Sequence, residues 1–197
     1  LGDVYKRQEL GDTMSLDKVP FTKIRKEILN QYKRGGMSSL SWHLRNPLTG
    51  GDSWDVSDTT VVKSILPGGA NHEKFTGWVS KVSAFINSLQ TEEGVKVPVL
   101  FRPWHEHTGS WFWWGEKLCT PEEYKALWHM TVDILRNDGV DNALYAYSPG
   151  SEPQDTAQYL KRYPGDELID LIGFDTYQFE RDTYLANLEK SLAIVDS

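Results

Sequence analysis

Cysteine is nearly absent from this chain: Cys119 is the only one among 197 residues. A single thiol cannot form an intrachain disulfide, so the fold depends on a hydrophobic core, which a chain of this length can bury within one domain. Long apolar runs are missing too, and none approaches the roughly 20 residues that a membrane-spanning helix needs. The sequence therefore predicts a globular domain without a membrane span, and Cys119 is interpreted as an incidental thiol.

Basic residues are outnumbered, with 21 Lys and Arg against 28 Asp and Glu, which gives a formal net charge of −7. There is no basic stripe, so nucleic acid is not an expected partner, and a polybasic membrane patch is absent as well. No glycine-rich phosphate-binding motif follows any expected strand, which argues against a nucleotide site. The balance suits an uncharged polymer, and we expect no cofactor. Nothing in the sequence defines an oligomeric state.

Segments of helical periodicity alternate with short apolar segments along the chain. Apolar strands that alternate with helices indicate a parallel sheet with helices outside it. Polar residues follow the carboxyl ends of the strands, the edge that carries the active site in a (β/α)8 barrel and the ligand in an open doubly wound sheet. The fold class is α/β, and both architectures satisfy this pattern. The expected strands are 36–42, 97–101, 142–147 and 168–174, and the expected helices are 21–34, 58–66, 75–89, 120–135, 155–163 and 182–195.

Local signals predict where several helices begin and end. The run 120–123, TPEE, has the form of a capping box with proline at the first helical position. Thr22 and Asp182 are predicted to cap the first and last helices, and Gly35 to end the first. Trp78 lies on an amphipathic stripe and is assigned to the core. The predicted inward residues of the last helix are Leu185, Leu188, Leu192 and Val195.

The most informative stretch is 97–115, VPVLFRPWHEHTGSWFWWG, which holds four of the eight tryptophans beside an arginine, two histidines and Glu106. Indole rings stack on the apolar faces of sugars, while polar groups bind the sugar hydroxyls. A carboxyl group beside aromatic rings has a raised pKa, because burial disfavours its charged form. A glycosidic general acid needs such a pKa. The stretch therefore indicates a carbohydrate cleft with Glu106 as its candidate general acid.

Two other interpretations of this stretch stay open. One is a hydrophobic strand followed by an aromatic loop with incidental polar residues. The other is a zinc site formed by His43, His105, His107 and Glu106. The aromatic loop has no role in a zinc site, so no metal is expected.

Three motifs resemble glycoside hydrolase family 26, whose members are mostly β-mannanases, with some β-glucan and xylan hydrolases. They are SWHLRNP with TGGDSWD (41–47 and 49–55), FRPWHEHTGSWFWWG (101–115) and IGFDTYQ (172–178). The resemblance begins at about residue 20 and covers most of the chain. It implies a (β/α)8 TIM barrel, of which this chain would hold roughly strands 3 to 6. It also implies retaining, endo-type hydrolysis of β-1,4-mannosidic bonds.

The resemblance assigns roles to residues by position. Glu106 matches the acid/base at the end of the family's fourth strand. His105 and His43 match histidines that line the subsite of the attacked sugar, and Trp111 matches the aromatic platform beneath that sugar. His107 stands where other members often have Asn or Met, which we interpret as a subsite variation.

Four more substrate-binding residues are implied. Tyr177 matches the tyrosine near the nucleophile, and Asp175 is a polar neighbour in the same motif. Arg102 matches the arginine that holds the catalytic carboxylates in place. Trp114 is assigned to the same aromatic site.

The family's nucleophile is a second glutamate after the seventh strand, and no residue here matches it, because Glu152 and Glu180 lie in loops of other units. A barrel takes about 250 residues. We therefore expect residues 9–197 to be the central part of a single catalytic domain that carries the acid/base half only and is inactive alone. Residues 1–8, which include DVYKRQ, resemble a sequencing or assembly scar.

The expected substrate is a mannan-type polysaccharide: mannan, galactomannan or glucomannan. One alternative is a family member that acts on β-glucan or xylan. Another, from a different class, is a non-catalytic glycan-binding domain of the same fold. Because such polymers lie outside cells, we expect the full-length protein to be secreted, or to lie at the cell surface or in the periplasm.

Overall fold

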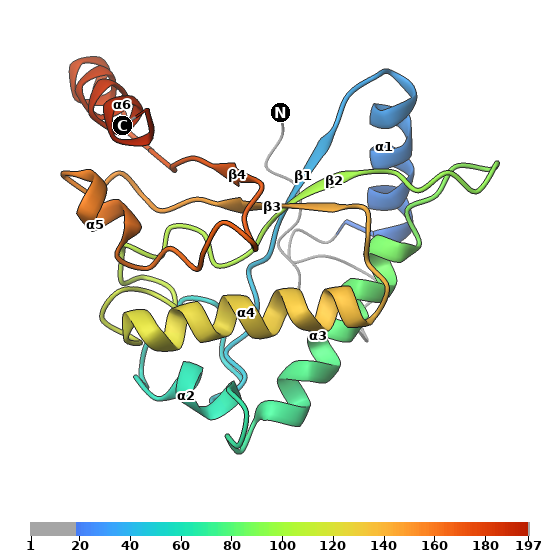
Figure 1. The fold of residues 1–197 in the computed structure, drawn as a ribbon, viewed down its shortest axis with the longest axis horizontal. Coiled ribbons are helices and arrows are strands. Elements are labelled where there is room, and N and C mark those ends of the chain that lie inside the picture. Colours follow the sequence, from blue (N-terminus) through green and yellow to red (C-terminus); the bar gives the residue numbers. More distant parts are fainter. Residues whose placement is uncertain (1–18, 197) are drawn as a thin grey trace.

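The computed structural model describes residues 19–196, and the predicted scar at 1–8 lies outside them. A parallel sheet of four strands, in the order β1-β2-β3-β4, forms the centre of the described part, with helices between the strands (Figure 1). The strands are β1 (Ser38–Ser41), β2 (Val99–Arg102), β3 (Ala143–Tyr147) and β4 (Leu171–Ile172). The helices are α1 (Phe21–Lys33), α2 (Val61–Ile65), α3 (His72–Asn87), α4 (Pro121–Asn137), α5 (Thr156–Leu160) and α6 (Arg181–Val195).

The strands pair in sequence order, with Ser38 opposite Val99, Val99 opposite Ala143, and Ala146 opposite Leu171. A doubly wound sheet reverses its strand order at a switch point, and no reversal occurs among the strands of residues 19–196. Consecutive parallel strands joined by helices are instead the architecture of a (β/α)8 barrel. The prediction of a partial barrel is confirmed.

The core lies between the sheet and helices α2, α3 and α4, which cover one of its faces (Figure 1). The ring of Trp42 packs against Phe75, Phe101 and Trp104 at centroid distances of 5.4–6.4 Å. Trp78 is buried on α3, so its assignment to the core is confirmed. Burying a large aromatic side chain stabilises the fold by roughly 1.5–3 kcal/mol, and these rings anchor the helices against the sheet.

The ends of α1 and α4 test the predicted caps. Thr120 accepts a hydrogen bond from the Glu123 N–H while the Glu123 carboxylate accepts one from the Thr120 N–H, so the capping box is confirmed. Gly35 follows α1 with φ of +81°, a conformation that glycine adopts readily. The prediction that Thr22 caps this helix is wrong: α1 begins at Phe21 with Pro20 as its N-cap, so Thr22 lies within the helix.

The last unit departs most from the prediction. In place of Asp182, Glu180 is the N-cap of α6. The predicted inward stripe is only partly right: Leu188 and Val195 are partly buried, but Leu185 and Leu192 are 39% and 51% exposed, while Ser191 and Ile194 are buried. Among the described elements, α6 lies near α5 and apart from α3 and α4 (Figure 1), which leaves Leu185 and Leu192 exposed.

Strand β4 is shorter than the predicted 168–174 because the side chain of Asp170 takes part in the pairing. The Tyr145 N–H donates to the Asp170 carboxylate at 2.8 Å, in place of a backbone carbonyl. The regular strand is Leu171–Ile172, and beyond it the N–H groups of Gly173 and Asp175 still donate to the Tyr147 and Pro149 carbonyls. None of the helices in residues 19–196 is both long and apolar enough to cross a membrane.

Candidate active site

The site begins where β2 ends, in a loop with two strained residues. Trp104 and Glu106 have φ of +54° and +53°, in the left-handed region that side chains other than glycine rarely adopt. Such residues cost about 1–3 kcal/mol each and cluster at functional sites. The Glu106 N–H donates to the Ser148 carbonyl at 2.8 Å, which ties this loop to the loop after β3.

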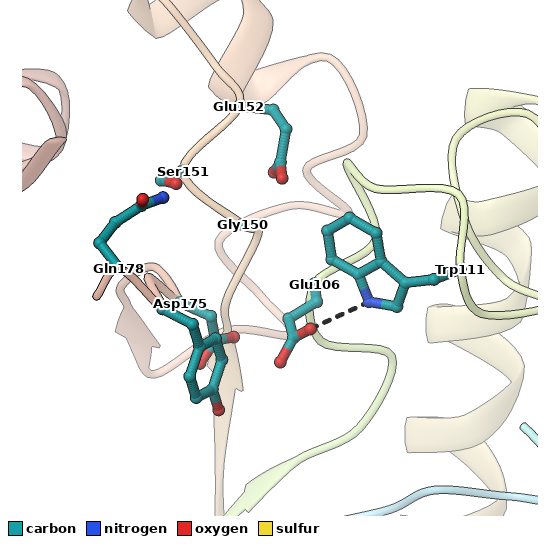
Figure 2. A pocket seen from close by; sticks show the side chains of 8 residues that line it. Glu106, Trp111, Gly150, Ser151, Glu152, Asp175 and Gln178 are labelled. Carbon is teal, nitrogen blue, oxygen red and sulfur yellow. Dashed lines mark hydrogen bonds between the residues drawn. The ribbon is translucent and has the colours of Figure 1, made fainter. Parts of the chain in front are cut away.

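Glu106 and Trp111 form one wall of a pocket of about 290 Å³ (Figure 2). The Trp111 Nε1–H donates to Glu106 Oε2 at 3.0 Å. The indole is 40% exposed, so one part of it holds the carboxyl group while the rest faces solvent. Its ring packs so closely on Gly109 that a Cβ there would lie 2.2 Å from it. The pocket is lined by Glu106, Trp111, Gly150, Ser151, Glu152, Asp175, Tyr177 and Gln178.

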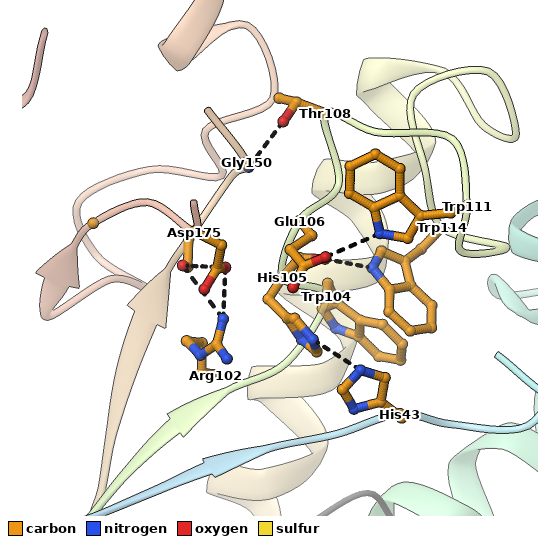
Figure 3. A network of polar contacts seen from close by, with 12 residues as sticks. His43, Arg102, Trp104, His105, Glu106, Thr108, Trp111, Trp114, Gly150 and Asp175 are labelled. Carbon is orange, nitrogen blue, oxygen red and sulfur yellow. Dashed lines mark hydrogen bonds and ion pairs between the residues drawn. The ribbon is translucent and has the colours of Figure 1, made fainter. Parts of the chain in front are cut away.

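Charged and polar groups from three strand ends meet at the floor of the site (Figure 3). Arg102 Nη1 lies 2.6 Å from Asp175 Oδ2, and the Ser148 hydroxyl donates to the same oxygen at 2.7 Å. The side chains of this ion pair are only 13% and 14% exposed. Buried charges persist when they are paired and hydrogen-bonded, so Asp175 is held in place as a compensated anion.

A histidine pair lies on the other side of Glu106, away from the loop after β3 (Figure 3). His43 Nε2 and His105 Nε2 are 3.2 Å apart. Burial, reinforced by Arg102 and then His43, lowers the pKa of His105 well below its usual value of 6.5. A neutral His105 can share one proton with His43. The His43 ring also stacks on Trp54 at 5.6 Å, and Trp54 is 43% exposed.

The structure buries His105 and Trp114, two of the predicted substrate-binding residues. Their exposures are 1% and 0%, so both rings lie behind the surface of the pocket. The Trp114 Nε1–H instead donates to the His105 carbonyl at 2.9 Å, which supports the backbone next to Glu106. Sequence reasoning missed this because a tryptophan in an aromatic loop looks the same whether its ring faces a cleft or the core.

His107 also lies outside the pocket, so its interpretation as a subsite variation is wrong. It is 1% exposed, with Tyr124 and Tyr147 at ring-centroid distances of 4.4 and 5.0 Å. In residues 19–196 no three histidine, cysteine or acidic side chains are arranged to hold a metal ion. The zinc interpretation of the histidines is therefore not supported.

A buried arginine that sequence reasoning missed supports the aromatic loop from behind. Arg162 is 3% exposed and donates to the carbonyls of Trp114, Gly115, Glu116 and Cys119. Its guanidinium also lies 5.2 Å from the centre of the Tyr124 ring. In sequence, Arg162 follows Lys161 after a short helix, and nothing local marks it as buried.

Cys119 is buried in the same region, and burial raises the pKa of its thiol to about 11. At neutral pH such a thiol stays protonated and unreactive. This agrees with its interpretation as an incidental residue.

The remaining predicted residues line or flank the pocket. Tyr177 is 65% exposed and lies at the rim beside Gln178. Sequence reasoning missed Trp54, although it belongs to the motif at 49–55, and it passed over Glu152, which lines the same pocket as Glu106.

Comparisons with known proteins identify the family of the chain. The chain is 60% identical to a family 26 β-mannanase of Bacteroides ovatus of known structure, with a TM-score of 0.93 over 94% of this chain and 54% of that one. It is 42% identical to a mannan endo-1,4-beta-mannosidase of Bifidobacterium adolescentis over 73% of this chain and 14% of that protein. A Bacillus subtilis protein of the same description is 29% identical over 82% of this chain and 45% of its own length.

The chain thus spans less than two thirds of the length of each of these relatives. The sequence model of glycosyl hydrolase family 26 matches residues 15–193, nearly the whole chain. This chain belongs to glycosyl hydrolase family 26.

Proposed function

We propose that this chain supplies the acid/base half of an enzyme that hydrolyses β-1,4-mannosidic bonds in mannan-type polysaccharides with retention of configuration. The hydrogen bond from the Trp111 indole to Glu106, at the edge of the pocket, carries this proposal. This hydrogen bond places a carboxyl group that can donate a proton beside an indole ring. The ring offers a flat apolar surface on which a pyranose ring can stack. The names of the relatives agree with mannan as the polymer.

In the first step Glu106 protonates the glycosidic oxygen while a second carboxylate attacks the anomeric carbon. The bond to the leaving sugar breaks, and a covalent glycosyl-enzyme forms. Because Trp111 donates to Oε2 of Glu106, we assign the transferred proton to Oε1. In the second step the Glu106 carboxylate takes a proton from water, which attacks the anomeric carbon and releases the sugar.

The attacked sugar is assigned to the region between Trp111 and His43. His105 positions His43 from behind. Tyr177 and the Asp175–Arg102 pair are assigned to its hydroxyl groups. Asp175 is compensated by Arg102 and Ser148, so we assign it as a hydrogen-bond acceptor and not as the attacking nucleophile.

None of the carboxylates in residues 19–196 is assigned as the nucleophile. We therefore expect the 197-residue chain to bind manno-oligosaccharides but not to hydrolyse mannan. Because the polymer lies outside cells, we propose that the protein acts after export.

A hybrid enzyme tests the proposal. Residues 19–196 replace the matching segment of the Bacteroides ovatus β-mannanase, whose fold agrees closely with this chain. We expect the hybrid to hydrolyse mannan, and Glu106→Ala to lower the rate by about a hundredfold or more. On a β-mannoside with an activated aryl leaving group, azide should restore turnover of Glu106→Ala and give the β-mannosyl azide. Glu116→Ala, a surface glutamate paired with Lys161, is the control.

Each other outcome has a distinct meaning. A Glu106→Ala rate within tenfold of the parent would exclude Glu106 as the acid/base. An azide product of inverted configuration would exclude the retaining mechanism. A hybrid that binds mannotetraose without cleaving it would favour the non-catalytic glycan-binding alternative.

A further inference from the structure

The pocket holds a second oriented carboxylate, Glu152, to which the reaction above gives no role. Glu152 follows β3 and lines the pocket together with Glu106 and Trp111. Figure 2 shows its side chain directed toward the space beside the Trp111 ring. A glutamate on an exposed loop usually extends into solvent. Neighbouring residues hold Glu152 in this different orientation.

The Thr108 hydroxyl, itself fixed by the Gly150 backbone, holds the Glu152 carboxylate over the strand end. The Thr108 hydroxyl donates to Glu152 Oε2 at 2.6 Å and accepts the Gly150 N–H at 2.9 Å. Gly150 has no side chain, and a Cβ at that position would lie 2.1 Å from Glu152 Oε2. The missing Cβ thus gives the carboxylate the space that it occupies. Thr108 comes from the loop that carries Glu106, so both acids are positioned by the same loop.

The position of Glu152 relative to Glu106 indicates what it can bind. In Figure 3 Glu106 lies between His43 on one side and the Thr108–Gly150 pair on the other. The attacked sugar is assigned to the His43 side. The sugar beyond the bond that Glu106 protonates then reaches the Thr108–Gly150 side. That sugar is neutral and rich in hydroxyl donors, and a carboxylate is a strong acceptor for them.

We propose that Glu152, oriented by Thr108 and Gly150, forms a binding site for the hydroxyl groups of the leaving-group sugar, a neutral β-1,4-linked hexopyranose. This inference rests on the proposed function, because it takes the side of the bond from the role of Glu106. It makes Glu152 a specificity residue: its carboxylate accepts hydrogen bonds from substrate and takes no part in breaking the bond.

The first test is the binding of mannotetraose to the 197-residue chain. Binding is measured by calorimetry and by the change in tryptophan fluorescence, to which the exposed Trp111 contributes. We expect Glu152→Ala to weaken binding about tenfold or more, as for the loss of hydrogen bonds to a charged group. Gly150→Ala should weaken it similarly, because its Cβ displaces the carboxylate while leaving the charge in place. Thr108→Val should have a smaller effect in the same direction.

Two matched controls share the chemistry of these changes but not the location. Gly77→Ala adds a Cβ on α3 where nothing lies within 4 Å. Glu92→Ala removes an exposed carboxylate in the loop before β2, at the opposite ends of the strands. Both variants should bind mannotetraose as the parent chain does.

Kinetics of the hybrid enzyme then locate the sugar. Glu152→Ala should lower kcat/KM about tenfold for manno-oligosaccharides, whose leaving group is a sugar. For an aryl β-mannobioside, whose leaving group is a phenol, the value should stay unchanged. Equal losses on both substrates, or a shifted acidic limb of the pH–rate profile, would overturn the leaving-group assignment and point to an electrostatic effect on Glu106.

The two proposals fail in different ways. If Trp111→Ala abolishes binding of mannotetraose while Glu152→Ala binds like the parent, the inference about Glu152 is overturned and the proposed function stands. If the hybrid enzyme neither binds mannotetraose nor hydrolyses mannan, both are overturned.

Discussion

At the scale of single residues, the left-handed backbone conformation of Glu106 lowers the stability of the fold. A φ of +53° is unfavourable for glutamate and easy for glycine. We predict that Glu106→Gly is more stable than Glu106→Ala by about 1 kcal/mol, the reverse of the usual order in regular structure. Urea unfolding of the two variants measures this. Equal midpoints would mean that the left-handed conformation carries no strain.

His107 gives a second residue-scale prediction, on pH. Burial, followed by the charge of Arg162, lowers the pKa of His107 well below 6.5 in the folded state. The unfolded chain then binds the proton first, so stability is complete above about pH 6.5 and falls as pH drops toward the folded-state pKa. The contribution of one such group is about 1.4 kcal/mol per pH unit.

His107→Met should remove this contribution and flatten the fall in stability below pH 6.5, as measured by urea unfolding at a series of pH values. At pH 8, where both forms are uncharged at this position, the variant should be at least as stable as the parent. Neither ring nitrogen of His107 has a hydrogen-bond partner among residues 19–196, so methionine removes two unsatisfied polar atoms. Parallel curves for the two proteins would contradict the prediction.

The roles of individual site residues could be predicted only where those residues belong to a recognisable sequence motif. Glu106 and Trp111 were found because a carboxyl group and an indole in one aromatic run have few other uses. The fully buried ring of Trp114 could not be distinguished from an exposed one, because the two differ only in tertiary packing. Glu152 could not be found either, because its orientation depends on the space left by Gly150 and on a hydroxyl 44 residues away.

At the scale of elements, the loop at 114–119 depends on Arg162, which lies beyond α5. Replacing Arg162 with methionine leaves several buried carbonyls without their donor, at about 1–3 kcal/mol for each group left unsatisfied. We predict a loss of about 3 kcal/mol in the free energy of unfolding, with partial recovery in Arg162→Lys. Urea unfolding measures the loss, and limited proteolysis within 108–118 should become faster.

Arg136→Met is the matched control for this change. Arg136 also donates to a backbone carbonyl, that of Glu167, and its guanidinium also lies near a tyrosine ring, that of Tyr145 at 6.0 Å. It is exposed, however, so water can replace its contacts, and its loss should cost less than about 1 kcal/mol. Similar costs for the two arginines would show that burial is not the deciding factor.

Element positions followed from periodicity and caps, and the failures have a common cause. The capping box at Thr120 was predictable because both of its hydrogen bonds form between residues three apart. Leu185 and Leu192 of α6 were misplaced because the direction of a buried face depends on what packs against it. The start of β4 was misplaced because the Asp170 side chain replaces a backbone group.

For the whole molecule, stability should be uneven across the sheet. Helices α3 and α4 cover the central strands, whereas both residues of β4 are more than 40% exposed. Segments with few buried contacts open with a lower free energy. We predict that amide hydrogens of β4 and α6 exchange faster than those of β2 and α4. Uniform protection, measured by exchange and mass spectrometry, would contradict this.

The cluster of tryptophans behind the site has an optical consequence. Trp104, Trp113 and Trp114 lie with ring centroids 5.1–5.5 Å apart and planes crossed at 61–89°. Chromophores this close and this strongly crossed couple their electronic transitions. They should give the folded chain a signed pair of circular dichroism bands that no single indole produces. Since Trp114 supports the backbone beside Glu106, these bands would report, without any label, whether the acid group has been brought into position.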